Sequence, residues 1–269
     1  MGRNQMLSAK TNTLAGFLIM LSCALFAQSM WVQPVFAKAV NFAAGGGLNY
    51  KQAKIGFINR QGTAVANKEP TLLNLEGFFA LAVKKFYFTV NADFTLLPDE
   101  ETKTAAAIDT DESISRYDFA MTAGFNITKS FSLFGGLLYG STDRDVVVTD
   151  TTSDTTISDE TMSMSEFGPY LGLNYTFYFK NHMSLGFNGA YAFMSGEQTW
   201  GQSGFDPEVS YKGDTQGTSL GVKFSGPMGR IASYYVGYKN TQYKFETDDS
   251  QFTTDENFQT LSAGVTFYF

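Results

Sequence analysis

Cysteine and histidine are nearly absent from this sequence. Cys23 is the only cysteine among 269 residues, and His182 is the only histidine. A disulfide framework needs cysteines in pairs, and a structural zinc site takes about four cysteine and histidine ligands. The composition therefore excludes both a disulfide-stapled fold and a cysteine-based metal site.

Long apolar runs are also lacking. The one extended run, residues 14–27, is too short to cross a bilayer as a helix, which takes about 20 residues. It follows a start that carries Arg3 and Lys10 but no acidic residue, and a small-residue site for signal peptidase ends at Ala37. We therefore predict that residues 1–37 form a secretory signal peptide.

The remainder, residues 38–269, is predicted to form one domain. No run in it is long enough for a membrane helix, which excludes a helical membrane protein. Cys23 lies in the removed segment, so the exported chain carries no thiol, as suits an oxidising compartment. Cleavage after Ala27 or Ala39, a retained anchor helix and lipidation of Cys23 are the weaker alternatives.

Aromatic residues and glycine are abundant, whereas proline is scarce. Phe and Tyr account for most of the 16% aromatic content, and the chain holds 26 glycines against 6 prolines. Without apolar runs of helical length, such a composition is typical of membrane β-barrels, whose outer surface is apolar and whose interior is narrow.

The strongest pattern is an alternation of apolar and polar side chains with the period of two that a β-strand has. In residues 260–269 every odd position is apolar, and the even positions are small or polar. Similar alternation marks ten segments, at residues 40–51, 71–83, 86–96, 116–127, 131–142, 170–179, 183–193, 218–225, 231–241 and 260–269. They predict an all-β fold, a transmembrane antiparallel up-and-down β-barrel of ten strands, with eight or twelve strands as the alternatives.

The two faces of these segments differ in charge. The apolar faces carry no Lys, Arg, Asp or Glu across the expected membrane depth. A Lys or Arg on the lipid face near the membrane midplane costs about 2–4 kcal/mol, which explains this exclusion. The opposite faces carry mainly Gly, Ser, Thr and Asn, which fit a narrow lumen. A soluble β-sandwich, the alternative, would place charges freely on its solvated face.

Short connections alternate with long polar ones. The short ones lie at residues 84–85, 128–130, 180–182 and 227–230, and the long ones near residues 59–70, 98–113, 143–162, 196–216 and 246–256. In membrane barrels the short turns are periplasmic and the long links are external loops, so both termini are predicted to be periplasmic. Three valines at residues 146–148 leave open that the neighbouring strands continue as a hairpin above the membrane.

Over residues 40–269 the chain resembles the small outer-membrane β-barrel proteins of Gram-negative bacteria. The most specific feature is the last segment, in which Val265, Phe267 and Phe269 alternate with polar residues. In that superfamily a terminal Phe preceded by alternating apolar residues is the signal read by the barrel-assembly machinery. The resemblance implies a location in the outer membrane, contact with its lipid and lipopolysaccharide, and recognition by that machinery.

A set of charged residues is predicted to face the lumen, because each occupies the polar face of its segment. The set comprises Lys51, Glu76, Asp93, Arg116, Asp118, Glu166, Lys223 and Lys239. One interpretation is a selectivity constriction for a permeating solute. The other is a network of mutually paired charges that fills and stiffens the lumen, because buried charges need partners.

Size and strand number also resemble those of the omptin surface proteases, which use an Asp–His pair and an Asp pair at the outer rim. This chain departs from that pattern, because its single histidine, His182, falls in a predicted periplasmic turn. We therefore predict no catalytic residue, no cofactor-binding residue and no resident metal site, and we expect a protein that is not an enzyme.

The long links are strongly acidic, and the net charge of the chain is -7. Acidic loops can attract divalent cations that bridge lipid phosphates, or they can be a solvated surface. Nucleic acid is an unsuitable partner for such a charge. Two functions remain: a non-catalytic surface, structural or interaction role through the acidic external loops, and a narrow porin-like channel for small solutes. An outer-membrane enzyme is a distant third.

Overall fold

The computed structural model describes residues 40–58, 68–105, 107–153, 155–203, 205–248 and 252–269. The predicted signal peptide lies outside the described residues. The eleven strands are β1 (Val40–Ile55), β2 (Thr71–Val83), β3 (Phe86–Leu97), β4 (Asp99–Ala105), β5 (Ile108–Asn126), β6 (Phe131–Asp150), β7 (Thr155–Tyr178), β8 (Ser184–Gln202), β9 (Phe205–Pro227), β10 (Ala232–Thr247) and β11 (Thr253–Tyr268). Within these described ranges no helix has the length and apolar character needed to cross a membrane.

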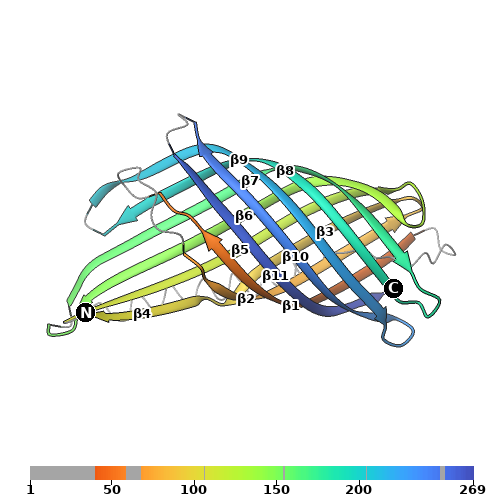
Figure 1. The fold of residues 1–269 in the computed structure, drawn as a ribbon, viewed down its shortest axis with the longest axis horizontal. Helices are drawn as coiled ribbons and strands as arrows, with labels where there is room; N and C mark the ends of the chain where they lie inside the picture. The colour runs from red at the N-terminus through yellow and green to blue at the C-terminus, as the bar shows by residue number, and fades with distance from the viewer. Residues whose placement is uncertain (1–39, 59–67, 106, 154, 204, 249–251) are drawn as a thin grey trace.

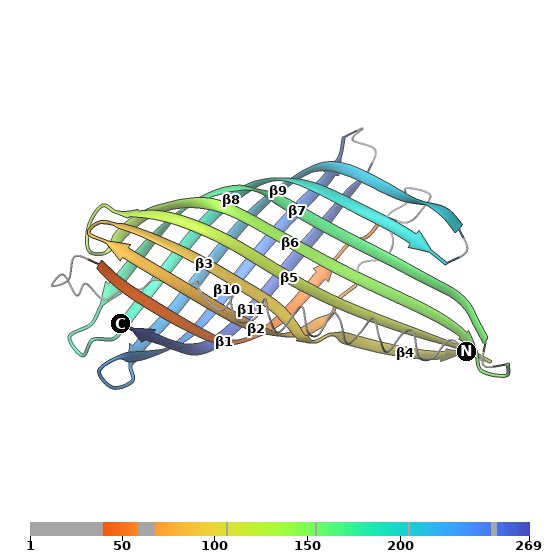
Figure 2. The ribbon, with the colours of Figure 1, turned by 180° about the vertical axis from the view of Figure 1, so that it is seen from behind.

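The strands form one antiparallel sheet that closes on itself (Figures 1 and 2). Apart from β3 and β4, each strand pairs with its neighbours in sequence, and β1 pairs with β11. Pro98 separates β3 from β4, and both pair with β5, so together they occupy one position in the wall. The wall therefore has ten strands, which confirms the predicted fold and strand number.

The short turns lie at one end of the barrel, which we call the turn end. The first residues of β1 and the last of β11 pair there, as Ala43 does with Tyr268. Lys84, His182 and Gly229 adopt positive φ angles in three of these turns, as tight reversals often require. The opposite end, where β6 meets β7 and β10 meets β11, is the hairpin end.

Three of the five predicted long loops are mostly strand, so the prediction was wrong for them; residues 59–67 of the first predicted loop lie outside the described residues. Strands β5 to β9 have 19 to 24 residues each, although about 9–11 suffice to cross a membrane. Residues 98–113, 143–162 and 196–216 lie largely within paired strands. Antiparallel neighbours satisfy each other's backbone groups in water as well as in lipid, so the ladder can continue beyond the membrane. The extended hairpin that the three valines at 146–148 suggested is present.

The face of the strands that carries the apolar side chains changes along the barrel, as β7 shows. Toward the turn end Leu171 points outward and is 65% exposed, whereas Gly172 faces the lumen. Toward the hairpin end Met164 points inward and is 1% exposed, whereas Ser163 lies on the outer face. Apolar side chains thus face outward where lipid is expected and inward where water is expected, because each medium selects the opposite surface.

A ring of outward aromatic residues marks this change. Six strands carry an outward aromatic residue close to the position of this change, and these residues are Tyr50, Tyr117, Tyr139, Phe167, Phe193 and Tyr238. Aromatic girdles of this kind lie at membrane–water interfaces. We call the part of the barrel on the turn side of this girdle the membrane segment, and the part on the hairpin side the crown.

The interior of the crown is an apolar core. Phe57 and Ile58, which follow β1, are fully buried in it. The Ile58 amide donates a hydrogen bond of 3.0 Å to Gln198 Oε1 on β8. Trp200, the only tryptophan of residues 38–269, packs in the same core. The crown is therefore filled with side chains, like the interior of a soluble β-protein.

Glycine at Gly47 allows Tyr235 to cross the lumen. A methyl group at this position would lie 2.6 Å from the Tyr235 hydroxyl and 2.3 Å from the backbone oxygen of Ala263. We expect Gly47→Ala to lower the free energy of unfolding by about 1–3 kcal/mol through overpacking. The matched control is Gly189→Ala, where only Leu220 lies near, at 3.4 Å, and a change within about 0.5 kcal/mol is expected. Urea unfolding in detergent, followed by circular dichroism, measures both; equal losses would contradict the expectation.

Candidate functional site: the charged belt of the lumen

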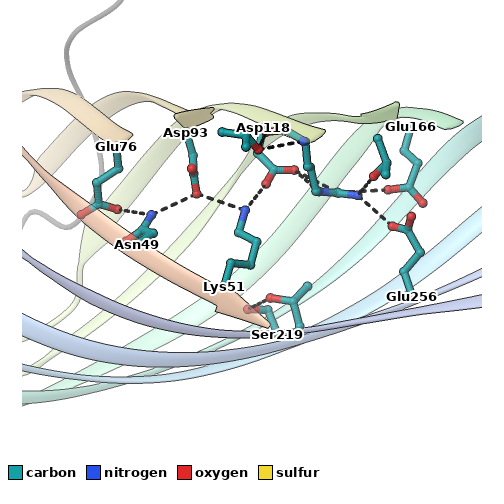
Figure 3. A network of polar contacts seen from close by, with 12 residues as sticks. Asn49, Lys51, Glu76, Asp93, Asp118, Glu166, Ser219 and Glu256 are labelled. Atoms are coloured by element: carbon teal, nitrogen blue, oxygen red, sulfur yellow. Dashed lines mark hydrogen bonds and ion pairs between the residues drawn. The ribbon is translucent and has the colours of Figure 1, made fainter. Parts of the chain in front are cut away.

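A group of charged side chains crosses the lumen where the membrane segment meets the crown. It is built from Lys51 on β1, Asp93 on β3, Arg116 and Asp118 on β5, Glu166 on β7 and Glu256 on β11, and we call it the charged belt. All six face inward because each occupies a lumen-facing position in the period of two of its strand. Figure 3 labels Lys51, Asp93, Asp118, Glu166 and Glu256 of this group and shows their side chains reaching toward one another from different strands.

Lys51 joins two carboxylates. Its Nζ lies 3.2 Å from Asp93 Oδ2 and 2.9 Å from Asp118 Oδ2. The side chain is buried, so the ammonium group has given up its water and its charge is balanced by these two acids. Lys51 thus ties β1 to β3 and β5 across the lumen.

Arg116 is the centre of the belt. Its Nη2 lies 2.9 Å from Asp118 Oδ1 and 3.6 Å from Glu166 Oε2, and its Nη1 lies 2.8 Å from Glu256 Oε2. Nη1 also donates a hydrogen bond of 2.8 Å to Thr142 Oγ1. The residue is 3% exposed, so its contacts with these groups replace hydration.

The guanidinium of Arg116 also lies over an aromatic ring. Its Cζ is 4.2 Å from the ring centroid of Phe258, which belongs to the crown core. Buried cation–π contacts of this kind are worth about 2 kcal/mol. The belt is therefore attached directly to the apolar core beside it.

A polar extension reaches from the belt toward the turn end. Asn49 Nδ2 donates hydrogen bonds of 3.0 Å to Asp93 and 3.1 Å to Glu76, and the Tyr235 hydroxyl donates to Glu76. Lys223 lies with its Nζ 3.5 Å from the ring centroid of Tyr235. Glu76 and Lys223 thus lie on the turn side of the belt.

Lys239 is placed differently from the other predicted residues. It lines the lumen cavity, yet the ion pairs of the belt in the described part of the chain do not include it. The structure therefore brings five of the eight predicted residues into the belt and places Glu76, Lys223 and Lys239 around its turn side.

Sequence reasoning missed Glu256, Asn49 and Tyr235. The predicted last strand began at residue 260, whereas β11 begins at Thr253. Glu256 has the same parity as the lumen-facing Thr260, so extending the pattern by two periods would have found it. Asn49 lay on the predicted polar face, but it is uncharged and was not singled out.

A second charged group lies inside the crown. Arg144 Nε lies 2.6 Å from Glu112 Oε1, and Lys68 forms an ion pair with the same carboxylate. Burial raises the pKa of Glu112, but the hydrogen bonds from Arg144 and Lys68 outweigh it, so the pKa lies below its usual value. Arg144 lies over the ring of Phe57, 5.6 Å from its centroid, and thereby connects this group to the crown core.

The lowered pKa of Glu112 predicts a loss of crown stability in acid. A carboxylate whose pKa is lower when folded stabilises the fold above its unfolded pKa, near 4.5, and loses this contribution as pH falls toward the folded value. We expect Glu112→Gln to be less stable than the unmutated protein at pH 7, and the difference to shrink below pH about 4.5. Fluorescence of Trp200 during urea unfolding measures it. A difference that stays constant from pH 7 to pH 3 would contradict the assignment.

A cavity of about 270 Å³ adjoins the belt and extends toward the turn end. Polar side chains, including those of Asn49, Asp93 and Asn188, line it together with the rings of Tyr87 and Tyr170. Tyr243 and Phe258 line it where it meets the crown, and both belong to the crown core. Among the described residues, the lining thus extends to the belt and to the nearest residues of the crown core, and it does not include Phe57, Ile58 or Trp200.

The remaining predicted features lie away from the belt. His182 is exposed in the turn between β7 and β8, at the turn end. Val265 and Phe267 face outward on β11, and Phe269 follows as an exposed residue whose amide donates to the Phe42 carbonyl. The part of the chain that the structure describes contains no group of three or more His, Cys, Asp or Glu placed to hold a metal ion.

Comparisons with known proteins show likeness in structure only. No family model matches the chain, and no curated protein sequence matches it. The crystal structure of the outer membrane protease OmpT from Escherichia coli is similar with a TM-score of 0.58 at 10% identity, covering 86% of this chain and 96% of that one. The translocator domain of the autotransporter NalP from Neisseria meningitidis has a TM-score of 0.45 at 10% identity, covering 98% and 97%. The chain therefore has the fold of the outer-membrane β-barrels.

Proposed function

We propose that the chain is a closed outer-membrane barrel of a Gram-negative bacterium that acts at the cell surface through its crown, without catalysis. The observation that carries this proposal is that side chains of the charged belt and the crown core occupy the lumen on the crown side of the cavity. In this proposal the turn end, with both termini, is periplasmic, and the crown stands outside the cell.

The closed lumen favours a structural or interaction role over the porin-like channel. A selectivity filter holds its charges toward a water-filled path. Here Arg116 and Lys51 are buried and directed at carboxylates, and the residues beyond them, such as Phe57 and Ile58, are fully buried and apolar. A solute passing through would have to displace both groups.

A non-catalytic role is supported by the position of the one histidine. His182 lies in a turn at the opposite end from the crown, so it cannot serve as a base at the cell surface. The partners we propose are the lipid around the membrane segment, lipopolysaccharide at the girdle, and divalent cations at the acidic hairpins. Val265, Phe267 and Phe269 are proposed as the signal for the barrel-assembly machinery.

Conductance in a planar bilayer tests this function. The protein is refolded in detergent, its folding is verified by circular dichroism, and it is inserted at single-molecule density. We expect a silent bilayer, with insertion confirmed by flotation of the protein with vesicles of the same lipid after a carbonate wash. Steady unitary openings of the folded protein would overturn the proposal and support the channel.

A further inference from the structure

Strand β4 has an open edge. It pairs with β5 on one side, from Asp99 opposite Ile114 to Ala105 opposite Ile108. Within the described ranges no strand pairs with its other side, and six of its seven residues are exposed. Figures 1 and 2 show β4 along the border of the sheet where it projects into the crown. A row of backbone donors and acceptors therefore faces outward there.

The open edge arises because β2, which pairs with β3, does not extend far enough toward the hairpin end to lie beside β4. The pairing of β2 with β3 ends at Leu73 opposite Leu97, next to a register shift. Beyond Pro98 the chain continues as β4, and a slit of about 420 Å³ separates it from the chain segment before β2. Lys68, Glu69 and Pro70 line one side of the slit.

The edge and the slit are acidic. Asp99, Glu100 and Glu101 of β4 line the slit with Glu69 and Glu112, and Lys68 is its one basic lining residue. Lys103 Nζ lies 2.8 Å from Glu101 Oε2, and Lys68 pairs with Glu112. The excess of carboxylates attracts a basic chain and repels a second copy of the same edge.

We propose that the β4 edge and its slit bind an extended, lysine- or arginine-rich segment of a partner protein outside the cell by strand addition. Backbone hydrogen bonds along the edge would supply affinity, and the slit would take a basic side chain. Seven residues match the length of a short strand. This inference rests on the proposed surface role of the crown. Charges on an edge can also serve only to prevent aggregation, which is the alternative that the experiment addresses.

The probe is a capped, fluorescently labelled heptapeptide in which lysine alternates with valine and threonine. Its matched control is the same peptide with alternate backbone nitrogens methylated, which keeps every charge but removes the donors that strand pairing needs. Binding to the refolded full chain is measured by fluorescence anisotropy, and amide hydrogen exchange of β4 is followed with and without the peptide. The protein variant is Glu100→Lys with Glu101→Lys, compared with Lys212→Glu on the outer face of β9.

We expect the methylated peptide to bind the unmutated protein at least tenfold more weakly than the unmethylated peptide does. We expect the β4 variant to bind the unmethylated peptide at least tenfold more weakly than the unmutated protein does, and this peptide to slow exchange of the β4 amides. Equal binding of both peptides, or none at all, would overturn the proposal, as would protection, without peptide, of the β4 amides that face away from β5. Edge-to-edge dimers in sedimentation would assign the edge to a second copy instead. Because conductance is measured separately, a silent bilayer without peptide binding would refute this inference and leave the proposed function standing.

Discussion

Replacing Arg116 by alanine is expected to lower the free energy of unfolding by about 3–5 kcal/mol, or to prevent refolding. Arg116 contacts the carboxylates of Asp118, Glu166 and Glu256, and all but Asp118 are almost completely buried. Without the guanidinium, Glu166 and Glu256 would be left as like charges in the interior. Urea unfolding in detergent micelles, followed by circular dichroism, measures the loss.

A double-mutant cycle separates the ion pair from the packing. Combining Arg116→Ala with Glu256→Gln removes one of the unpaired buried charges. The free energy of unfolding of the double variant should therefore fall by less than the sum of the decreases in the two single variants. Stability that is unchanged in Arg116→Ala would contradict the paired network. If conductance changed at the same time, the belt would be a constriction for a permeating solute.

The second large effect is expected in the crown, for Phe245→Asp on β10. Phe245 is fully buried and packs against Ile58 and Met164. The substitution both removes a core side chain and places a carboxylate in an apolar interior, so a loss above about 3 kcal/mol is expected. The emission of Trp200 should shift to the red, and the crown should become sensitive to protease.

The control for this substitution lies three residues away on the same strand. Gln242 has the opposite parity to Phe245 and is exposed on the outer face of the crown. Gln242→Asp should leave both the Trp200 emission and protease resistance unchanged. Equal effects at the two positions would contradict the inward apolar face, because a loop or a water-filled crown would tolerate both.

The membrane segment could be predicted from the sequence because lipid imposes one rule on every strand. The predicted segment at residues 71–83 coincides with β2, and the ten predicted segments correspond to the ten strands of the wall. The lumen-facing charges followed from the same parity, since Lys51 and Arg116 occupy polar-face positions among apolar neighbours.

The crown could not be predicted from that rule, because its apolar side chains have the opposite parity. Met162 and Met164 alternate with serine and threonine as regularly as Leu171 and Leu173 alternate with small residues. An apolar outer face was the only criterion for a strand, so residues 143–162 were assigned to a loop. Searching for a reversal of parity would have located the crown, and with it Glu256 of the belt.

Accessibility of spin labels along β7 tests the central structural claim most directly. The chain outside the predicted signal peptide lacks cysteine, so single cysteines can be placed at Ser163, Met164 and Leu171 of the protein in vesicles. The label at 171 should collide with dissolved oxygen, as in lipid, and the label at 163 with a water-soluble nickel chelate. The label at 164 should collide with neither. Access of the nickel chelate to position 164 would show a water-filled crown and contradict the closed barrel.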